Sequence, residues 1–178
     1  GIKIHADEIA SIGASEVAAR LRAASADHLL KVPDSSIEKL AAANVVATVL
    51  PLTAFSLKEP FAPARKMIDA GCAVALATDY NPGSCFSGNI PLMIALSCIY
   101  MKLSIEETIT AMTLNGAAAL HRAETIGSIE EGKHGDLVLL SYPSITYLPY
   151  HTGENIVDTV IKNGQIVHLD HPQIPCSI

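Results

Sequence analysis

Seven consecutive uncharged residues read Cys72-Ala73-Val74-Ala75-Leu76-Ala77-Thr78, and the acidic residue Asp79 follows them directly. A second apolar run, Val45–Leu50, is rich in β-branched residues. Runs of this length that do not alternate with polar residues are typical of strands that are buried on both faces. We therefore expect a parallel sheet that is covered on both sides, with a crossover connection between successive strands.

Helical and extended patterns alternate on either side of these runs. Gly1–His5 is predicted to form a strand that ends in polar residues, and a short segment, Ser25–Leu29, also ends in polar residues. The spacing of apolar residues predicts helices over about 15–24, 35–43, 63–70, 90–101 and 104–121. The order of these elements gives four β/α units. They could be half of a (β/α)8 barrel or a small, complete doubly wound sheet, and spacing alone leaves both possibilities open.

Three of the expected helix ends carry sequence signals of their own. Ser35 with Glu38, and Ser104 with Glu107, have the spacing of a capping box, in which each side chain accepts a backbone N–H of the first turn. Gly71 follows the expected helix over 63–70, at the position where many helices end on a left-handed glycine.

The pattern changes near residue 123, where turns and strands replace β/α units. Asn163-Gly164 separates two extended runs, Val157–Lys162 and Gln165–His168, and this dipeptide is a strong hairpin signal. We therefore expect two parts, residues 1–122 with the β/α units and residues 123–178 as a small β-rich piece.

Composition excludes several classes of protein. The chain has 178 residues, a net charge of −6 and 49% apolar residues, so it can bury a substantial core. An acidic chain without a basic run is not expected to bind nucleic acid. No apolar stretch approaches the roughly 20 residues of a membrane helix, so no membrane association is expected.

The four cysteines form no CxxC pair and are expected to be thiols of a reducing, cytoplasmic protein. They are Cys72, Cys85, Cys98 and Cys176.

Polar residues follow the expected strands at their carboxyl ends, where α/β folds bind their ligands. His5, His28 and Asp79 are the candidates for a metal or acid–base cluster, because imidazole and carboxylate suit zinc or iron. The third strand ends in Pro51-Leu52-Thr53, which offers little chemistry. Each candidate taken singly also has a plain structural explanation as a hydrogen-bonded histidine or a turn-forming aspartate.

Several segments together resemble the imidazolonepropionase family of metal-dependent amidohydrolases, which act in histidine degradation. The resemblance runs from Lys3 to about His168. The most particular segments are His5-Ala6-Asp7-Glu8, Asp79-Tyr80-Asn81-Pro82-Gly83-Ser84 and Tyr147-Leu148-Pro149-Tyr150-His151. The resemblance implies the C-terminal half of a (β/α)8 TIM barrel, with strands 5 to 8 in residues 1–122, plus part of a small β-sandwich in residues 123–178.

The resemblance also implies a role for each candidate residue. His5 and Asp79 would bind one divalent metal, zinc or iron. His28 and Asp79 would accept the proton of the water that the metal activates. Glu8 would bind the imidazolone ring and assist catalysis. The propanoate chain of the substrate would be held by Asn81, Gly83 and Ser84. The implied reaction is hydrolysis of 4-imidazolone-5-propanoate to N-formimidoyl-L-glutamate.

The family pattern is incomplete in this sequence. The family's His-x-His motif and further substrate contacts belong to an N-terminal half that is absent here, so the chain alone is expected to be inactive. The complete enzyme is expected to be a homodimer that acts on a small molecule. Two other hypotheses remain: a related amidohydrolase such as a cytosine or guanine deaminase-like enzyme, and a non-catalytic α/β domain. A substrate panel would separate the first of these, and metal binding the second.

Overall fold

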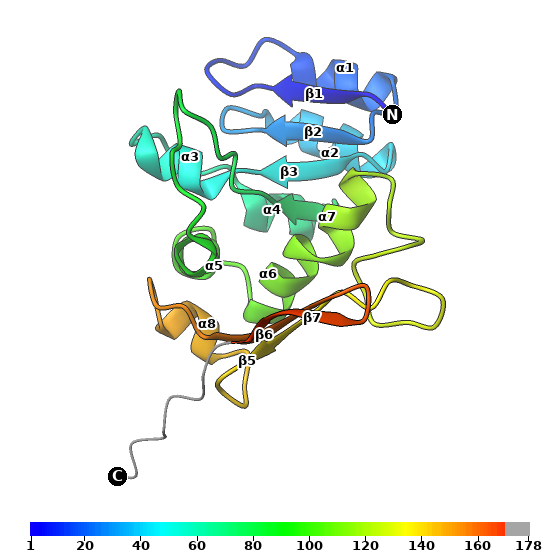
Figure 1. Ribbon diagram of the computed structural model, residues 1–178. Coiled ribbons are helices and arrows are strands. Elements are labelled where there is room, and N and C mark those ends of the chain that lie inside the picture. Colours follow the sequence, from blue (N-terminus) through cyan, green and yellow to red (C-terminus); the bar gives the residue numbers. More distant parts are fainter. Residues whose placement is uncertain (170–178) are drawn as a thin grey trace.

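The computed structural model describes residues 1–169, so Cys176 and the end of the expected β-rich part lie outside the described residues. Figure 1 shows the order of the elements along the chain. They are β1 (Lys3–Ala6), α1 (Ala14–Arg20), β2 (Ser25–His28), α2 (Asp34–Ala42), β3 (Val46–Val49), α3 (Pro51–Ser56), α4 (Ala64–Asp69), β4 (Val74–Leu76), α5 (Ile90–Ile99), α6 (Ile105–Met112), α7 (Leu114–Ala119), β5 (Leu137–Leu140), α8 (Tyr147–Tyr150), β6 (Val157–Lys162) and β7 (Gln165–Leu169).

Four strands form the parallel sheet that the apolar runs predict, in the order β1-β2-β3-β4. Each strand pairs with the next one along the chain, and the register sets His5 opposite Asp27 and Thr48 opposite Ala75. Because the pairing is parallel throughout, all four carboxyl ends lie at one edge of the sheet. This edge is the place where a ligand site is expected.

The two faces of the parallel sheet differ. Helices α1, α2 and α4 bury one face in the main core, in which Leu40, Met67 and Val49 are fully buried. On the other face a small cluster of Val46, Ala75 and Ala119 ties α7 to the strands, and the rest faces a large cavity. The expected cover is therefore complete on the first face, whereas on the second face α6 and α7 cover β3 and β4 and the rest borders the cavity.

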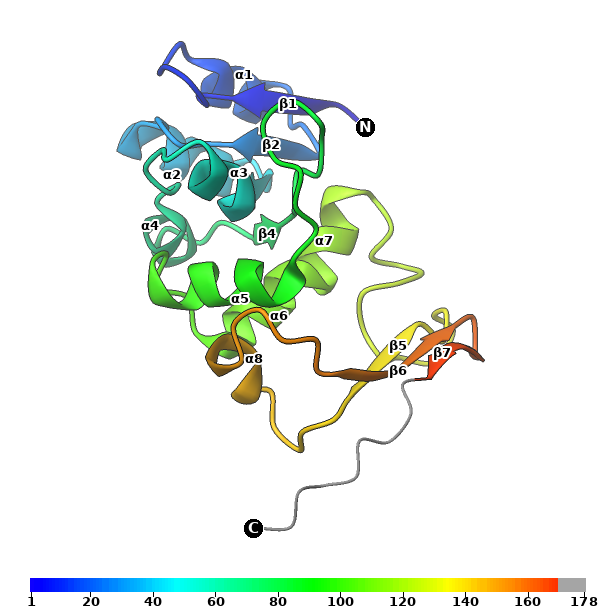
Figure 2. The same cartoon turned by 60° about the vertical axis from the view of Figure 1, so that its left-hand side comes forward.

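The antiparallel sheet β5-β6-β7 lies at the opposite end of the molecule from β1, as Figures 1 and 2 show. Its predicted hairpin is confirmed, because Asn163 and Gly164 both have positive φ, 50° and 76°, between β6 and β7. Of the parts described, no helix combines the length and apolar character needed to cross a membrane.

Two predictions about helices are wrong. The helix expected over 104–121 is two helices, α6 and α7, because Thr113 leaves helical geometry at φ −106° and ψ −84°. The capping box expected at Ser35 and Glu38 does not form. Helix α2 begins one residue earlier, at Asp34 after Pro33, so Ser35 already lies inside the first turn and cannot cap it. The short helices α3 and α8 were not expected.

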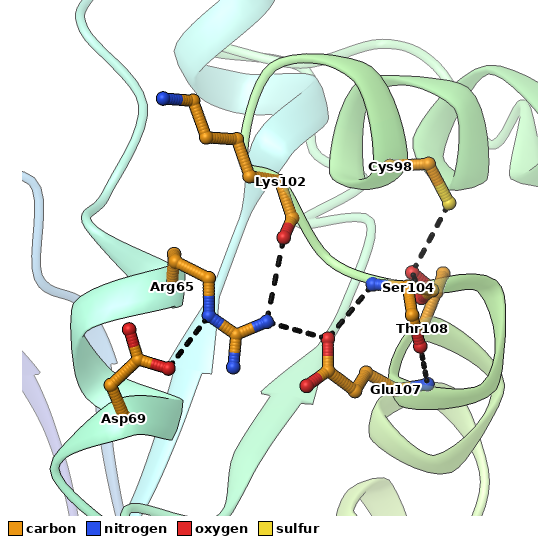
Figure 3. Close-up of polar contacts among 7 residues, drawn as sticks. All are labelled: Arg65, Asp69, Cys98, Lys102, Ser104, Glu107 and Thr108. Atoms are coloured by element: carbon orange, nitrogen blue, oxygen red, sulfur yellow. Dashed lines mark hydrogen bonds and ion pairs between the residues drawn. The ribbon is translucent and has the colours of Figure 1, made fainter.

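The other capping box joins a polar network between α4 and α6, drawn in Figure 3. The Ser104 hydroxyl accepts the Glu107 N–H at 3.1 Å, and Glu107 Oε2 accepts the Ser104 N–H at 2.8 Å. Arg65, on α4, donates to the same Glu107 oxygen at 2.8 Å and to Asp69 at 2.9 Å. One carboxylate therefore caps α6 and fixes it to α4.

Replacing Ser104 with alanine tests the capping box. Ser104→Ala removes the acceptor for the Glu107 N–H, and we expect the free energy of unfolding to fall by about 1 kcal/mol. Urea denaturation followed by circular dichroism measures this change. Ser141→Ala is the matched control, because the exposed Ser141 hydroxyl makes no hydrogen bond within the described structure. Equal losses in the two variants would contradict the capping role.

The same network predicts a dependence of stability on pH. The Arg65 side chain, and then the Ser104 N–H, hold the pKa of Glu107 below its usual value. A lowered folded-state pKa stabilises the fold above the unfolded pKa of about 4.3, and that contribution is lost as pH falls through the folded pKa. Urea titrations between pH 6 and pH 3 should therefore show a smaller loss of stability in Glu107→Gln than in the wild type. Glu106→Gln, which removes a carboxylate outside the Arg65 ion pair, should retain the wild-type slope.

Candidate active site at the carboxyl edge of the parallel sheet

The chain turns sharply where β1, β2 and β4 end. Asp7, His28 and Asp79 have positive φ values of 46°, 76° and 51°. This region is costly for residues with a Cβ, about 1 to 2 kcal/mol each, although Asp, Asn and His enter it more often than other residues. These turns keep the polar side chains of the strand ends near the edge of the sheet.

His5, Glu8 and His28 form the one close group of three possible metal ligands in the part of the chain that the structure describes. His28 Nε2 lies 3.2 Å from His5 Nδ1, and the two ring centroids are 4.7 Å apart. His28 Nδ1 lies 3.5 Å from Glu8 Oε1. One donor atom from each of the three residues lies within 4.8 Å of the others, so a single ion could be shared among them.

The buried position of His28 determines its protonation. Only 3% of the residue is exposed, and burial lowers the pKa of its imidazole. Glu8 opposes this shift by favouring the cation, whereas the neighbouring His5 adds to it. The imidazole is therefore neutral at neutral pH, which is the form that can bind a metal or accept a proton. Its Nδ1 is buried without a hydrogen-bond partner among the described residues.

Asp79, which follows β4, faces a small cavity that His5, Glu8 and His28 also line. This cavity has a volume of about 370 Å³, and its lining residues are His5, Glu8, His28, Asp79, Asn81 and Ser84. Asp79 Oδ2 accepts a hydrogen bond of 2.7 Å from Thr53 Oγ1, and Thr53 is itself buried. The two predicted ligands, His5 and Asp79, therefore share one cavity, although Asp79 lies outside the tight group of three donors.

Thr53 is a site residue that the sequence pattern did not indicate. The end of the third strand seemed to offer little chemistry, but Thr53 sits in the first turn of α3 and reaches Asp79 from there. Its place at the carboxyl edge of the sheet was the available signal, because every strand end in a parallel sheet faces its neighbours there.

Asp27 also lies at this edge, but it does not line the cavity of 370 Å³. Its Oδ1 accepts a hydrogen bond of 2.6 Å from Ser25 Oγ, and Lys3 Nζ lies 3.5 Å away. The carboxylate is thus paired inside the sheet, which accounts for its not joining the metal-ligand group.

The loop after Asp79 is held together by one side chain. Asn81 Oδ1 accepts the N–H groups of Gly83 and Ser84, both at 2.8 Å, and its Nδ2 donates to the Asp79 carbonyl at 2.7 Å. Asn81 and Ser84 line the cavity, whereas Gly83 is exposed and does not. The backbone N–H groups of Gly83 and Ser84 are therefore engaged within the loop. The predicted substrate contacts of these residues remain predictions.

The donor set fits a divalent metal. Two imidazoles and two carboxylates face one cavity, and this combination suits zinc or iron. The unpartnered Nδ1 of His28 adds a buried acceptor or donor that the protein itself leaves unsatisfied.

Replacing Thr53 with valine tests the support of Asp79. Thr53→Val keeps the shape of the side chain but removes the hydrogen bond, and we expect zinc affinity to fall about tenfold because the carboxylate loses its orienting donor. Isothermal titration calorimetry measures the affinity. Thr48→Val is the matched control, since Thr48 Oγ1 is equally buried but has no hydrogen-bond partner in the described part. A similar loss in both variants would show that the Thr53–Asp79 bond is unimportant.

The chain is similar in sequence to a known family and to individual proteins of known name. Residues 4–167 match the Amidohydrolase family. The chain is 66% identical over 165 residues to an imidazolonepropionase of Parabacteroides distasonis and 67% identical over 165 residues to one of Bacteroides thetaiotaomicron. Each match covers 93% of this chain and 40% of the relative, so the chain spans about two fifths of the length of these relatives.

Among solved structures, an adenosine deaminase from Xanthomonas campestris with bound zinc superposes with a TM-score of 0.79 at 27% identity. That match covers 92% of this chain and 44% of the deaminase.

Proposed function

Because the chain belongs to the amidohydrolase family, we propose that it is the C-terminal part of an imidazolonepropionase. The complete enzyme would hydrolyse the ring amide of 4-imidazolone-5-propanoate to N-formimidoyl-L-glutamate. The observation that carries the proposal is the cavity shared by His5, Glu8, His28 and Asp79, in a chain two thirds identical to two imidazolonepropionases.

His5 and Asp79 are the proposed ligands of one divalent metal, zinc or iron. The hydrogen bond from Thr53 supports this role for Asp79, because an oriented carboxylate is a better ligand than a mobile one. A metal held there supplies Lewis acidity, which makes a water molecule nucleophilic near neutral pH. His5 is exposed at the open edge of the sheet, which leaves room for further ligands from the rest of the enzyme.

His28 is the proposed base. Burial keeps its imidazole neutral, so it can accept a proton from the attacking water and return that proton to the leaving nitrogen. Asp79, which lines the same cavity, would also accept the proton of the attacking water. Glu8, about one third of whose side chain is exposed, is free to accept a hydrogen bond from the N–H of the imidazolone ring. Asn81, Gly83 and Ser84 form the loop that would hold the propanoate.

The proposed partner is the N-terminal portion of the same enzyme. A cavity of about 1220 Å³ between the two sheets is lined mainly by apolar residues such as Leu76, Ile94 and Met112. The uncovered edge of β1 and this apolar cavity would both be exposed in an isolated chain. Packing of the N-terminal portion would cover them, and it would bring the additional metal ligands.

The complete enzyme is proposed to be a cytoplasmic homodimer. The described cysteines Cys72, Cys85 and Cys98 are free thiols.

A chimera tests the proposed function. This chain replaces the matching two fifths of the Parabacteroides distasonis relative, and turnover of 4-imidazolone-5-propanoate is followed by chromatography. We expect hydrolysis by the chimera and a loss of about a thousandfold or more in His5→Ala and Asp79→Asn, because base and metal contributions are of that order. Ser104→Ala, which lies in the α6 cap, should retain activity.

The same chimera distinguishes the related hypotheses. A folded, zinc-loaded chimera that deaminates adenosine, guanine or cytosine but leaves the imidazolone intact would replace the proposal with a deaminase function. A folded chimera that binds no metal would favour the non-catalytic domain.

A further inference from the structure

Asp7 lies between two residues of the candidate site, His5 and Glu8, yet it faces away from the cavity. It is a buried carboxylate, with 2% of the residue exposed, and its φ of 46° turns the chain at the end of β1. A buried carboxylate in a left-handed conformation is costly, so a compensating set of interactions is expected.

Four donors surround the Asp7 carboxylate. Oδ1 accepts the N–H groups of Ile12 at 3.0 Å and Ala14 at 3.3 Å, while Oδ2 accepts the N–H of Ser15 at 3.3 Å and its hydroxyl. Helix α1 begins at Ala14 after Gly13, which has no capping side chain. Asp7 therefore takes the place of the missing N-cap and fixes the end of β1 to the start of α1.

The backbone at Asp7 is fixed to the neighbouring strand end. The Asp7 carbonyl accepts the Lys31 N–H at 2.8 Å, and the Ala6 carbonyl accepts the Leu29 N–H at 2.9 Å. His28 directly precedes Leu29, so the turn that carries Glu8 and the turn that carries His28 are bound to each other. Both connections pass through the two residues that precede Glu8.

We infer that Asp7 is a positioning residue that holds Glu8 and His5 in register with His28. Its side chain anchors the β1 turn to α1 on one side, and its carbonyl anchors the same turn to the β2 turn on the other. Without the carboxylate the β1 turn is free to relax from its positive φ, which moves both flanking side chains relative to His28. The expected effect on zinc affinity rests on the proposed function. The expected effect on the placement of the His5 and His28 rings does not.

Two variants and a control test the inference in the chain as it stands. Asp7→Asn removes the charge and replaces one acceptor oxygen with an NH2 group, and the milder Ser15→Ala removes only the hydroxyl donor. Ser104→Ala is the control for general loss of stability, because it removes a helix cap that does not touch the site. Nuclear Overhauser contacts between the His5 and His28 rings report geometry in the metal-free chain, and calorimetry with zinc reports affinity.

We expect Asp7→Asn to abolish the contact between the two rings and to lower zinc affinity by tenfold or more, a typical effect for a group that orients a ligand. Ser15→Ala should change both readouts in the same direction by a smaller amount, and Ser104→Ala should change neither.

A folded Asp7→Asn chain with wild-type ring contacts and affinity would overturn the inference, as would equal effects in Ser104→Ala. If Asp7→Asn does not fold, Ser15→Ala decides by the same criteria. A wild-type chain that shows the ring contact but binds no zinc would contradict the proposed metal site, and the ring contact in the variants would still decide the role of Asp7.

Discussion

The carboxyl ends of β1 to β4 meet at one edge because the four strands run parallel, and the whole candidate site depends on that pairing. The register brings His5 beside the end of β2 and sets Val49 opposite Leu76, so the turns that follow β3 and β4 also adjoin each other. Thr53 and Asp79 meet across those turns. A shift of one residue in β1 would turn the His5 side chain to the opposite face of the sheet.

Burial of His28 supports the chemistry at the edge of the sheet. Only 3% of the residue is exposed, and burial lowers the pKa of its imidazole, while Glu8 opposes that shift. A neutral imidazole can accept a proton, and the adjacent carboxylate favours the cation that forms. The fold thus sets the proton chemistry of the site as well as its geometry.

Sequence reasoning works well where the signal is local. The continuous apolar runs, the Asn163-Gly164 turn and the Ser104 capping box each depend on a few neighbouring residues, and the structure confirms all three. It fails at Ser35, where the choice between two adjacent starting points for α2 depends on the preceding proline. It also fails at Thr53 and Asp7, whose partners lie 26 and up to 8 residues away and depend on tertiary packing.

The most direct test of this account is a crystal of the chain loaded with zinc, measured by anomalous diffraction at the zinc edge. We expect a peak in the cavity lined by His5, Glu8, His28 and Asp79, at about 2.0 to 2.1 Å from a nitrogen of His5. A peak at another histidine, such as His134 or His151, with none in this cavity would contradict the claim that parallel pairing assembles a metal site at the edge of the sheet.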